Sequence, residues 1–192
     1  MQPEDLYRLM ESCHAEAVRV PDALSHSEWR VRYAAAVAAG RWRDAAHLPA
    51  LEALLEREDD EPLYTQPAVH FEGAGVPLPP GYDDATALAE YVGPVRVVFP
   101  REPTVREREA WRRRGRIKQA VLFAIASIGR ASPRIEQRIA AYVGSEAEDA
   151  VVRAAAARCL GILGAREHVE VLRAAAKSDD WCLATEAARG LR

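Results

Sequence analysis

Apolar residues along this chain recur in short alanine-rich blocks that resemble one another. Residues 149–164 read Asp-Ala-Val-Val-Arg-Ala-Ala-Ala-Ala-Arg-Cys-Leu-Gly-Ile-Leu-Gly, and similar blocks stand at residues 28–40, 117–129 and 180–191. A block that is apolar on almost every side predicts a helix packed between neighbouring helices. The recurrence of such helices predicts a fold of stacked repeats that share one core.

The spacing of the blocks defines the repeats. Val31, Ile117, Val152 and Leu183 occupy the same position in the four blocks. Ile117 and Val152 are 35 residues apart, and Val152 and Leu183 are 31 residues apart, which suits one helix-turn-helix unit each. The 86 residues between Val31 and Ile117 are too many for one repeat, so the sequence predicts an insertion there.

The segment after each block predicts a second, amphipathic helix. Each of these segments has one apolar stripe and is polar elsewhere, and Pro49 and Pro133 stand in the first turn, where the missing N–H costs little. The stripes are Leu48, Leu51 and Leu55; Ile135, Ile139 and Val143; and Val169, Leu172 and Ala176. A further helix, roughly Glu4 to Val20, is expected to cap the first repeat.

We therefore predict an all-α fold, an alpha-alpha superhelix of about four repeats in a single domain spanning residues 1–192. Its predicted parts are an N-terminal capping helix (1–21), repeat 1 (28–58), an insertion (60–108), repeat 2 (112–145), repeat 3 (149–177) and a partial repeat 4 (180–192).

The insertion contains eight of the twelve prolines of the chain. Its runs at residues 68–72 and 94–99 are rich in β-branched and aromatic residues, so they predict a small antiparallel β-ribbon. Long insertions in compact domains are usually either functional or disordered. Because this one carries several apolar residues, we expect an ordered flap at one edge of the concave face.

Two blocks resemble a known repeat. Their shared pattern is an acidic residue, then Val-Arg, then an alanine-rich stretch that ends in glycine. This pattern is similar to the HEAT repeat, in the short form found in phycobilisome-lyase-type HEAT-like proteins. The matching residues are Asp149, Val152, Arg153, Ala155, Ala156, Leu160 and Gly161, and Glu28, Val31, Arg32, Ala35, Ala36 and Gly40. The resemblance implies an armadillo-type alpha-solenoid in which Arg32, Asp149 and Arg153 form a ladder between successive repeats. Repeats 2 and 4 depart from it at Arg114, Lys118 and Ala184.

Charge is uneven on the two sides of the insertion. Residues 52–61 are strongly acidic, whereas residues 106–118 are strongly basic and contain Trp111. A basic stripe with an aromatic residue is suited to binding phosphates or stacking on a base. The same pattern also fits a solvated basic helix face, or one that pairs with the acidic run, and a peptide-binding role is a third interpretation.

Composition and motifs narrow the function classes. The net charge is −3, so no global positive field attracts nucleic acid or membrane. No apolar run reaches the roughly 20 residues of a membrane span, and three scattered cysteines favour a reducing cytoplasm. The phosphate-loop, nucleophile-elbow and zinc-protease motifs are absent from the sequence. We expect neither a metal nor another cofactor.

The sequence thus favours a noncatalytic recognition scaffold that binds a protein or peptide partner on the concave face of the second helices and on the flap. The candidate binding residues are His70, Tyr82, Trp111, Arg112, Arg113 and Arg116. One alternative is nucleic-acid binding, resembling the HEAT-like alkylpurine DNA glycosylases, through residues 112–118 and the four tryptophans. Another is a lyase-like enzyme or enzyme subunit. A homodimer through the C-terminal repeat is also expected, because the apolar side of its helix (Leu183, Ala187, Ala188, Leu191) would be uncovered.

Overall fold

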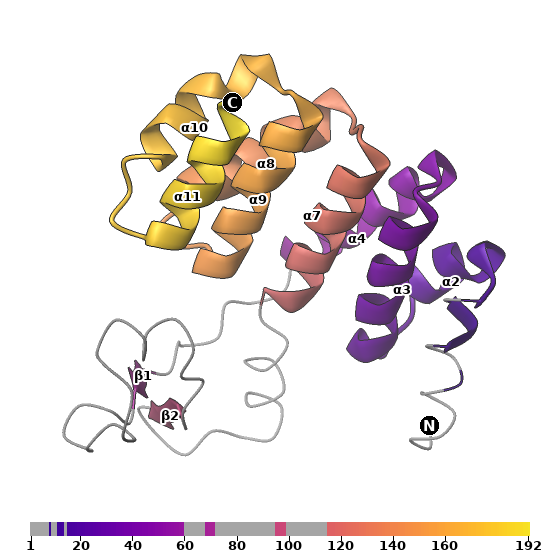
Figure 1. Cartoon of the computed structure of the whole chain (residues 1–192). Helices are drawn as coiled ribbons and strands as arrows, with labels where there is room; N and C mark the ends of the chain where they lie inside the picture. Colours follow the sequence, from indigo (N-terminus) through magenta and orange to yellow (C-terminus); the bar gives the residue numbers. More distant parts are fainter. Residues whose placement is uncertain (1–7, 9–10, 14, 60–67, 72–94, 99–114) are drawn as a thin grey trace, which may run out of the picture. The chain divides into compact units, whose positions relative to one another are not determined.

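The computed structural model describes residues 8, 11–13, 15–59, 68–71, 95–98 and 115–192. The chain separates into two compact units, one made of residues 1–62 and 113–192 and the other of residues 63–112. The predicted insertion thus coincides closely with the second unit. The first unit is an all-α solenoid built from packed helical pairs (Figure 1).

The alanine-rich blocks form one layer of helices, called here the first-helix layer. Its members are α3 (Trp29–Trp42), α7 (Arg116–Ile128), α9 (Ala150–Leu163) and α11 (Trp181–Gly190). Each packs against the next in chain order, so α3 contacts α7 directly although the insertion separates them in sequence. The alanines and glycines of these helices allow this close packing, as their pattern predicts.

The amphipathic segments form the second helices, α4 (Leu48–Asp59), α8 (Pro133–Gly144) and α10 (Val169–Ala175). Their predicted stripes face the core, since Leu51, Leu55, Ile135, Ile139, Val143 and Leu172 are all buried. Short 3-10 turns, η2 (Ala45–His47) and η3 (Arg166–His168), lead into α4 and α10. Helix α10 therefore begins at Val169, the first residue of its predicted apolar stripe.

Capping residues fix the ends of the first helices. The carboxylates of Glu28, Asp149 and Asp180 accept hydrogen bonds from backbone N–H groups in the first turns of α3, α9 and α11, which satisfies donors that a helix leaves unpaired. Gly164 ends α9 with a positive φ of 65°, a conformation that glycine adopts without strain.

The N-terminal segment differs from the single helix predicted up to Val20. Residues 8, 11–13 and 15 are helical, but Glu16 is extended, and the 3-10 turn η1 (Ala17–Arg19) and the short helix α2 (Val20–Leu24) follow. Proline is tolerated only in the first turn of a helix, and Pro21 occupies that place in α2. The prediction of one continuous helix was wrong because a new helix begins at this proline.

In the second unit, β1 (Ala68–Phe71) pairs with β2 (Val95–Val98) in an antiparallel arrangement that sets His70 opposite Arg96. These strands fall within the two runs from which the sequence predicts a ribbon. The other parts of the predicted flap lie outside the described residues.

The apolar side of the C-terminal helix α11 is less exposed than the sequence predicts. Leu183 and Ala187 of α11 are fully buried, because α11 packs against both α9 and α10. Ala188 and Leu191 are exposed, so the uncovered apolar side is smaller than predicted. Dimerisation through this repeat stays a prediction.

Candidate functional site

The sequence-predicted binding residues fall largely outside the part of the chain that the structure describes. Tyr82, Trp111, Arg112 and Arg113 lie outside it, and for His70 only the backbone pairing of β1 is described. Arg116 is the first residue of α7 and is exposed. Binding by these residues therefore stays a prediction.

The acidic run before the insertion has structural partners within the helical unit. The Glu52 carboxylate accepts a hydrogen bond from the backbone N–H of Ser132 at the start of α8 (3.1 Å). The Glu56 carboxylate lies 2.7 Å from the Arg134 guanidinium and 3.9 Å from that of Arg138. These contacts join α4 to α8, so within the described residues these two glutamates have partners in repeat 2.

The contacts of Arg32 differ from the ladder between successive repeats that the sequence resemblance implies. Its guanidinium is buried and donates to the Glu58 carboxylate at 2.9 and 3.1 Å and to the carbonyls of His26 and Ser27. Glu58 belongs to the second helix of the same repeat, so this arginine joins the two helices of one hairpin. A buried guanidinium is tolerated because a carboxylate and two carbonyls replace its hydration.

Links between repeats do exist, but with other partners. Arg153 donates to the carbonyl of Val143 at the end of α8 (3.3 Å), which ties repeat 3 to repeat 2. The Lys118 ammonium lies 2.6 Å from the Glu148 carboxylate, and both side chains are mostly buried. The basic position of the repeat is therefore structural in all three repeats that possess it.

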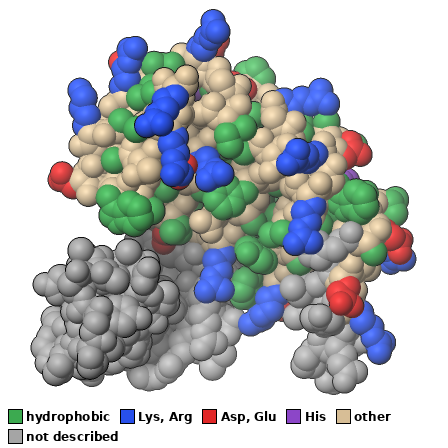
Figure 2. All heavy atoms as spheres, in the orientation of Figure 1, with side chains coloured by type: hydrophobic (Ala, Val, Ile, Leu, Met, Phe, Trp, Pro, Cys, Tyr) green, Lys and Arg blue, Asp and Glu red, His purple; other side chains and the backbone are tan. Residues whose placement is uncertain are grey.

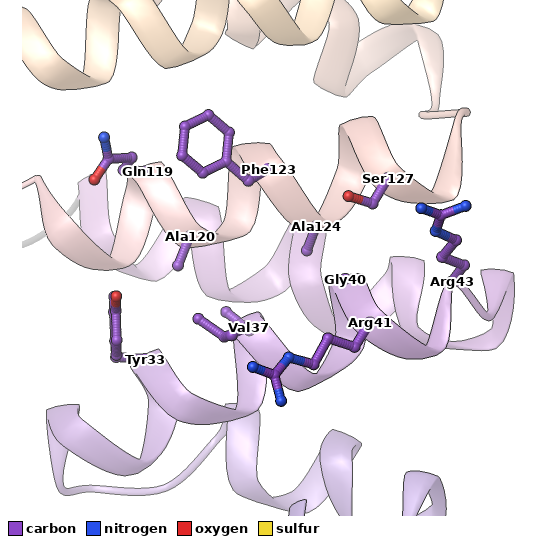
Figure 3. A pocket seen from close by; sticks show the side chains of 11 residues that line it. Tyr33, Val37, Gly40, Arg41, Arg43, Gln119, Ala120, Phe123, Ala124 and Ser127 are labelled. Carbon is purple, nitrogen blue, oxygen red and sulfur yellow. The ribbon is translucent and has the colours of Figure 1, made fainter. Parts of the chain in front are cut away.

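A groove between α3 and α7 is the candidate site (Figure 3). Its volume is about 510 Å³, which lies within the roughly 300–1,000 Å³ of ligand pockets. Figure 3 places Tyr33 and Gln119 at one end and Arg43 and Ser127 at the other. The lining residues are Tyr33, Ala36, Val37, Gly40, Arg41, Arg43, Gln119, Ala120, Phe123, Ala124 and Ser127.

The groove arises because small residues form its floor and long residues its rim. A Cβ atom built on Gly40 would lie 3.1 Å from the Cα atom of Ala124, so the helices approach closely there. Tyr33 and Phe123 stand at the rim and are 39% and 41% exposed. Aromatic side chains that are exposed to this extent provide apolar surface and ring faces that a partner can contact.

Two arginines, Arg41 and Arg43, line the groove. Arg41 is in the last turn of α3, and Arg43 follows it in a left-handed conformation (φ 54°) that ends the helix. Both side chains are exposed, and no ion pair to either is formed within the described residues. The groove lining contains no acidic residue, so the site favours an anionic group.

Some of the other arginines of the first-helix layer lie near a carboxylate. Arg158 and Arg189 both lie near the Glu186 carboxylate, at 3.8 and 2.7 Å, and the Arg158 guanidinium also lies 5.8 Å from the Phe123 ring centroid. Figure 2 shows basic side chains spread among apolar ones over this face. Among the residues that line the groove, the basic ones are Arg41 and Arg43.

Sequence reasoning missed this groove. With Val31, Ile117 and Val152 in register, Tyr33 corresponds to Gln119 and Phe123 corresponds to Arg158. An aromatic residue at a position that is polar in another repeat was the available signal. It could not reveal that Tyr33 and Phe123 line one groove, because their helices are joined through the long insertion.

Other chemistry is limited in the described part of the chain. There, no cluster of three or more His, Cys, Asp or Glu side chains could hold a metal ion. Burial raises the pKa of the Cys159 thiol to about 12, so this cysteine is a neutral, unreactive thiol at neutral pH. No helix among the described residues is long and apolar enough to cross a membrane.

Comparison with known proteins agrees with this architecture. Residues 112–192, which include α7 to α11, match the family of HEAT repeats. The match supports a HEAT-repeat protein, and the phycobilisome-lyase subtype stays a prediction. No curated protein and no solved structure matches the chain.

Proposed function

We propose that this protein is a noncatalytic recognition module that binds a protein partner through its first-helix layer, at the groove between α3 and α7. The groove carries the proposal, because it combines exposed aromatic side chains with arginines that have no carboxylate partner among the described residues. HEAT repeats commonly mediate protein interactions, which supports the same class of function.

The proposal moves the binding face relative to the sequence prediction, which favoured the second helices. On that side, two pairs of charged side chains are formed: Arg134 with Glu56, and Arg173 with Glu170. Exposed, paired charges contribute little to recognition. Partly exposed aromatic side chains around a groove are more typical of a binding surface.

Site-specific photo-crosslinking tests which face binds. The photoreactive residue benzoylphenylalanine would replace Phe123 in the groove, or Glu170, whose side chain is 81% exposed on α10. After irradiation in cells of the source organism, we expect position 123 to give a discrete protein adduct that the Tyr33→Ala change weakens. An adduct formed only from position 170 would instead support the second-helix face, and adducts from neither position would contradict a recognition role at both faces.

A further inference from the structure

We infer that the groove between α3 and α7 takes an acidic peptide segment that inserts one aromatic or branched apolar side chain between Tyr33 and Phe123. This inference rests on the proposed function and adds the chemistry of the partner. It follows from the shape of the groove and from the placement of Arg41 and Arg43, which have no carboxylate partner among the described residues.

The shape of the groove suits an inserted side chain of a peptide better than the surface of a folded protein. Its floor consists of Ala36, Gly40, Ala120 and Ala124, which offer no polar side chain to a ligand. A volume of about 510 Å³ accommodates a few side chains of an extended or helical segment. Burying one large apolar group against this floor and the two rings supplies most of the attraction.

The charge of the groove selects an acidic neighbour for that side chain. Arg43 stands at one end beside Ser127, and Figure 3 shows Arg41 extending along α3 toward Val37. A guanidinium binds a carboxylate with two parallel hydrogen bonds. Carboxylates next to the anchoring side chain would therefore reach the arginines while the anchor occupies the apolar part.

Peptide is favoured over nucleic acid by the distribution of charge. A phosphate backbone presents evenly spaced charges and requires a track of cations. On the first-helix layer, Arg158 and Arg189 share Glu186, and Arg30 lies 3.0 Å from the Glu28 carboxylate. Two arginines beside an apolar groove match a short acidic motif better than such a backbone.

Selection from a phage-displayed library of random dodecapeptides tests the inference on the full-length protein. We expect the wild-type protein to enrich peptides that combine Asp or Glu with Phe, Tyr, Trp or Leu. The affinity of a synthesised selected peptide should fall about tenfold or more in the Arg41→Glu/Arg43→Glu variant. Because both arginines are exposed, circular dichroism should show the variant folded. Its melting temperature should fall by a few degrees at most, since acidic residues at the C-terminal end of α3 interact unfavourably with the helix dipole.

Two further variants sharpen this measurement. Tyr33→Ala/Phe123→Ala should also weaken the peptide, because it removes the apolar walls. Arg166→Glu/Arg173→Glu makes the same change in charge at exposed positions at and next to α10, and it should leave the affinity within about twofold, as expected for screened distant charges. An equal loss in this control would show a general effect of net charge and would overturn the inference.

The remaining outcomes separate the inference from the proposed function. If selected peptides are neutral or basic, if they bind both groove variants as well as wild type, or if none is enriched, the inference is overturned. In those cases an adduct from position 123 would still support protein recognition. If oligo(dT) of about 20 nucleotides binds and is lost in Arg41→Glu/Arg43→Glu, the groove serves nucleic acid and the peptide inference fails.

Discussion

Helices α9 and α11 are in contact backbone to backbone, and this contact gives a sharp test of the packing. A Cβ atom added at Gly161 would lie 2.3 Å from the Cα atom of Gly190, whereas one added at Gly190 would lie 3.0 Å from the Cα atom of Gly161. Ordinary carbon–carbon contacts are about 3.5–4.0 Å. The Gly161→Ala substitution must therefore push the two helices apart by about 1 Å or more.

The magnitude is the balance of two opposing effects. Overpacking of a well-packed interface costs about 1–3 kcal/mol, while replacing glycine by alanine inside a helix contributes up to about 1 kcal/mol in the opposite direction. A 2.3 Å approach to backbone belongs to the upper part of the overpacking range, about 2–3 kcal/mol. Subtracting about 1 kcal/mol for the helix propensity of alanine, we expect Gly161→Ala to lower the free energy of unfolding by about 1–2 kcal/mol. Gly190→Ala should lower it less, because its steric contact is longer.

Urea unfolding followed by far-ultraviolet circular dichroism measures this effect. The matched control is Gly144→Ala at the end of α8, where an added Cβ meets no atom within 4 Å, so stability should be unchanged or rise by up to about 1 kcal/mol. If Gly161→Ala were as stable as the wild-type protein, the helices could not be as close as described. If Gly144→Ala lost as much as Gly161→Ala, the loss would not be caused by the contact between α9 and α11.

Three further predictions follow from buried and capping groups. Arg32→Met leaves the Glu58 carboxylate mostly buried and without its guanidinium partner, so the free energy of unfolding should fall by about 3–5 kcal/mol. The double variant Arg32→Met/Glu58→Leu should recover part of this lost stability. An unchanged urea midpoint in the single variant would refute the pairing. Ellman's reagent should modify the exposed Cys182 in the folded protein. Cys159 should react only after unfolding, because burial raises the pKa of its thiol to about 12. Modification of Cys159 in native buffer near pH 8 would contradict this burial. Asp180→Ala removes the side chain that accepts hydrogen bonds from two backbone N–H groups, so the free energy of unfolding should fall by about 1 kcal/mol. Asp180→Asn keeps an acceptor and should lower it much less. Equal losses of stability in thermal unfolding would exclude capping as the cause.

Features determined by local sequence could be predicted well. The bounds of α9 follow from the carboxylate of Asp149 at one end and from Gly164 at the other, and α9 lies within the block at residues 149–164 from which the sequence predicts a helix. The stripe of Ile135, Ile139 and Val143 is likewise buried. In each case the physical cause lies within a few residues, so a single sequence contains it.

Features determined by distant contacts could not be predicted. The partner of Arg32 is Glu58 in the next helix, whereas the repeat pattern pointed to a neighbouring repeat. The groove requires α3 and α7 to meet across the insertion, and no local pattern specifies that Tyr33 and Phe123 line the same cavity. The break at Glu16 was missed because Pro21 fits equally well after the end of one helix or at the start of another.

The packing of α3 directly on α7 has a consequence for how the protein folds. Val31 and Ile117 are 86 residues apart, whereas Ile117 and Val152 are 35 apart, so the α3–α7 interface closes a much longer loop than the α7–α9 interface. Each doubling of loop length costs about 0.6 kcal/mol of chain entropy, and distant contacts form late. We therefore expect α7 to α11 to fold first and α3 to dock afterwards. Native-state hydrogen exchange would then show α3 opening more readily than α9, which makes the groove the part of the helical unit most easily remodelled by a partner.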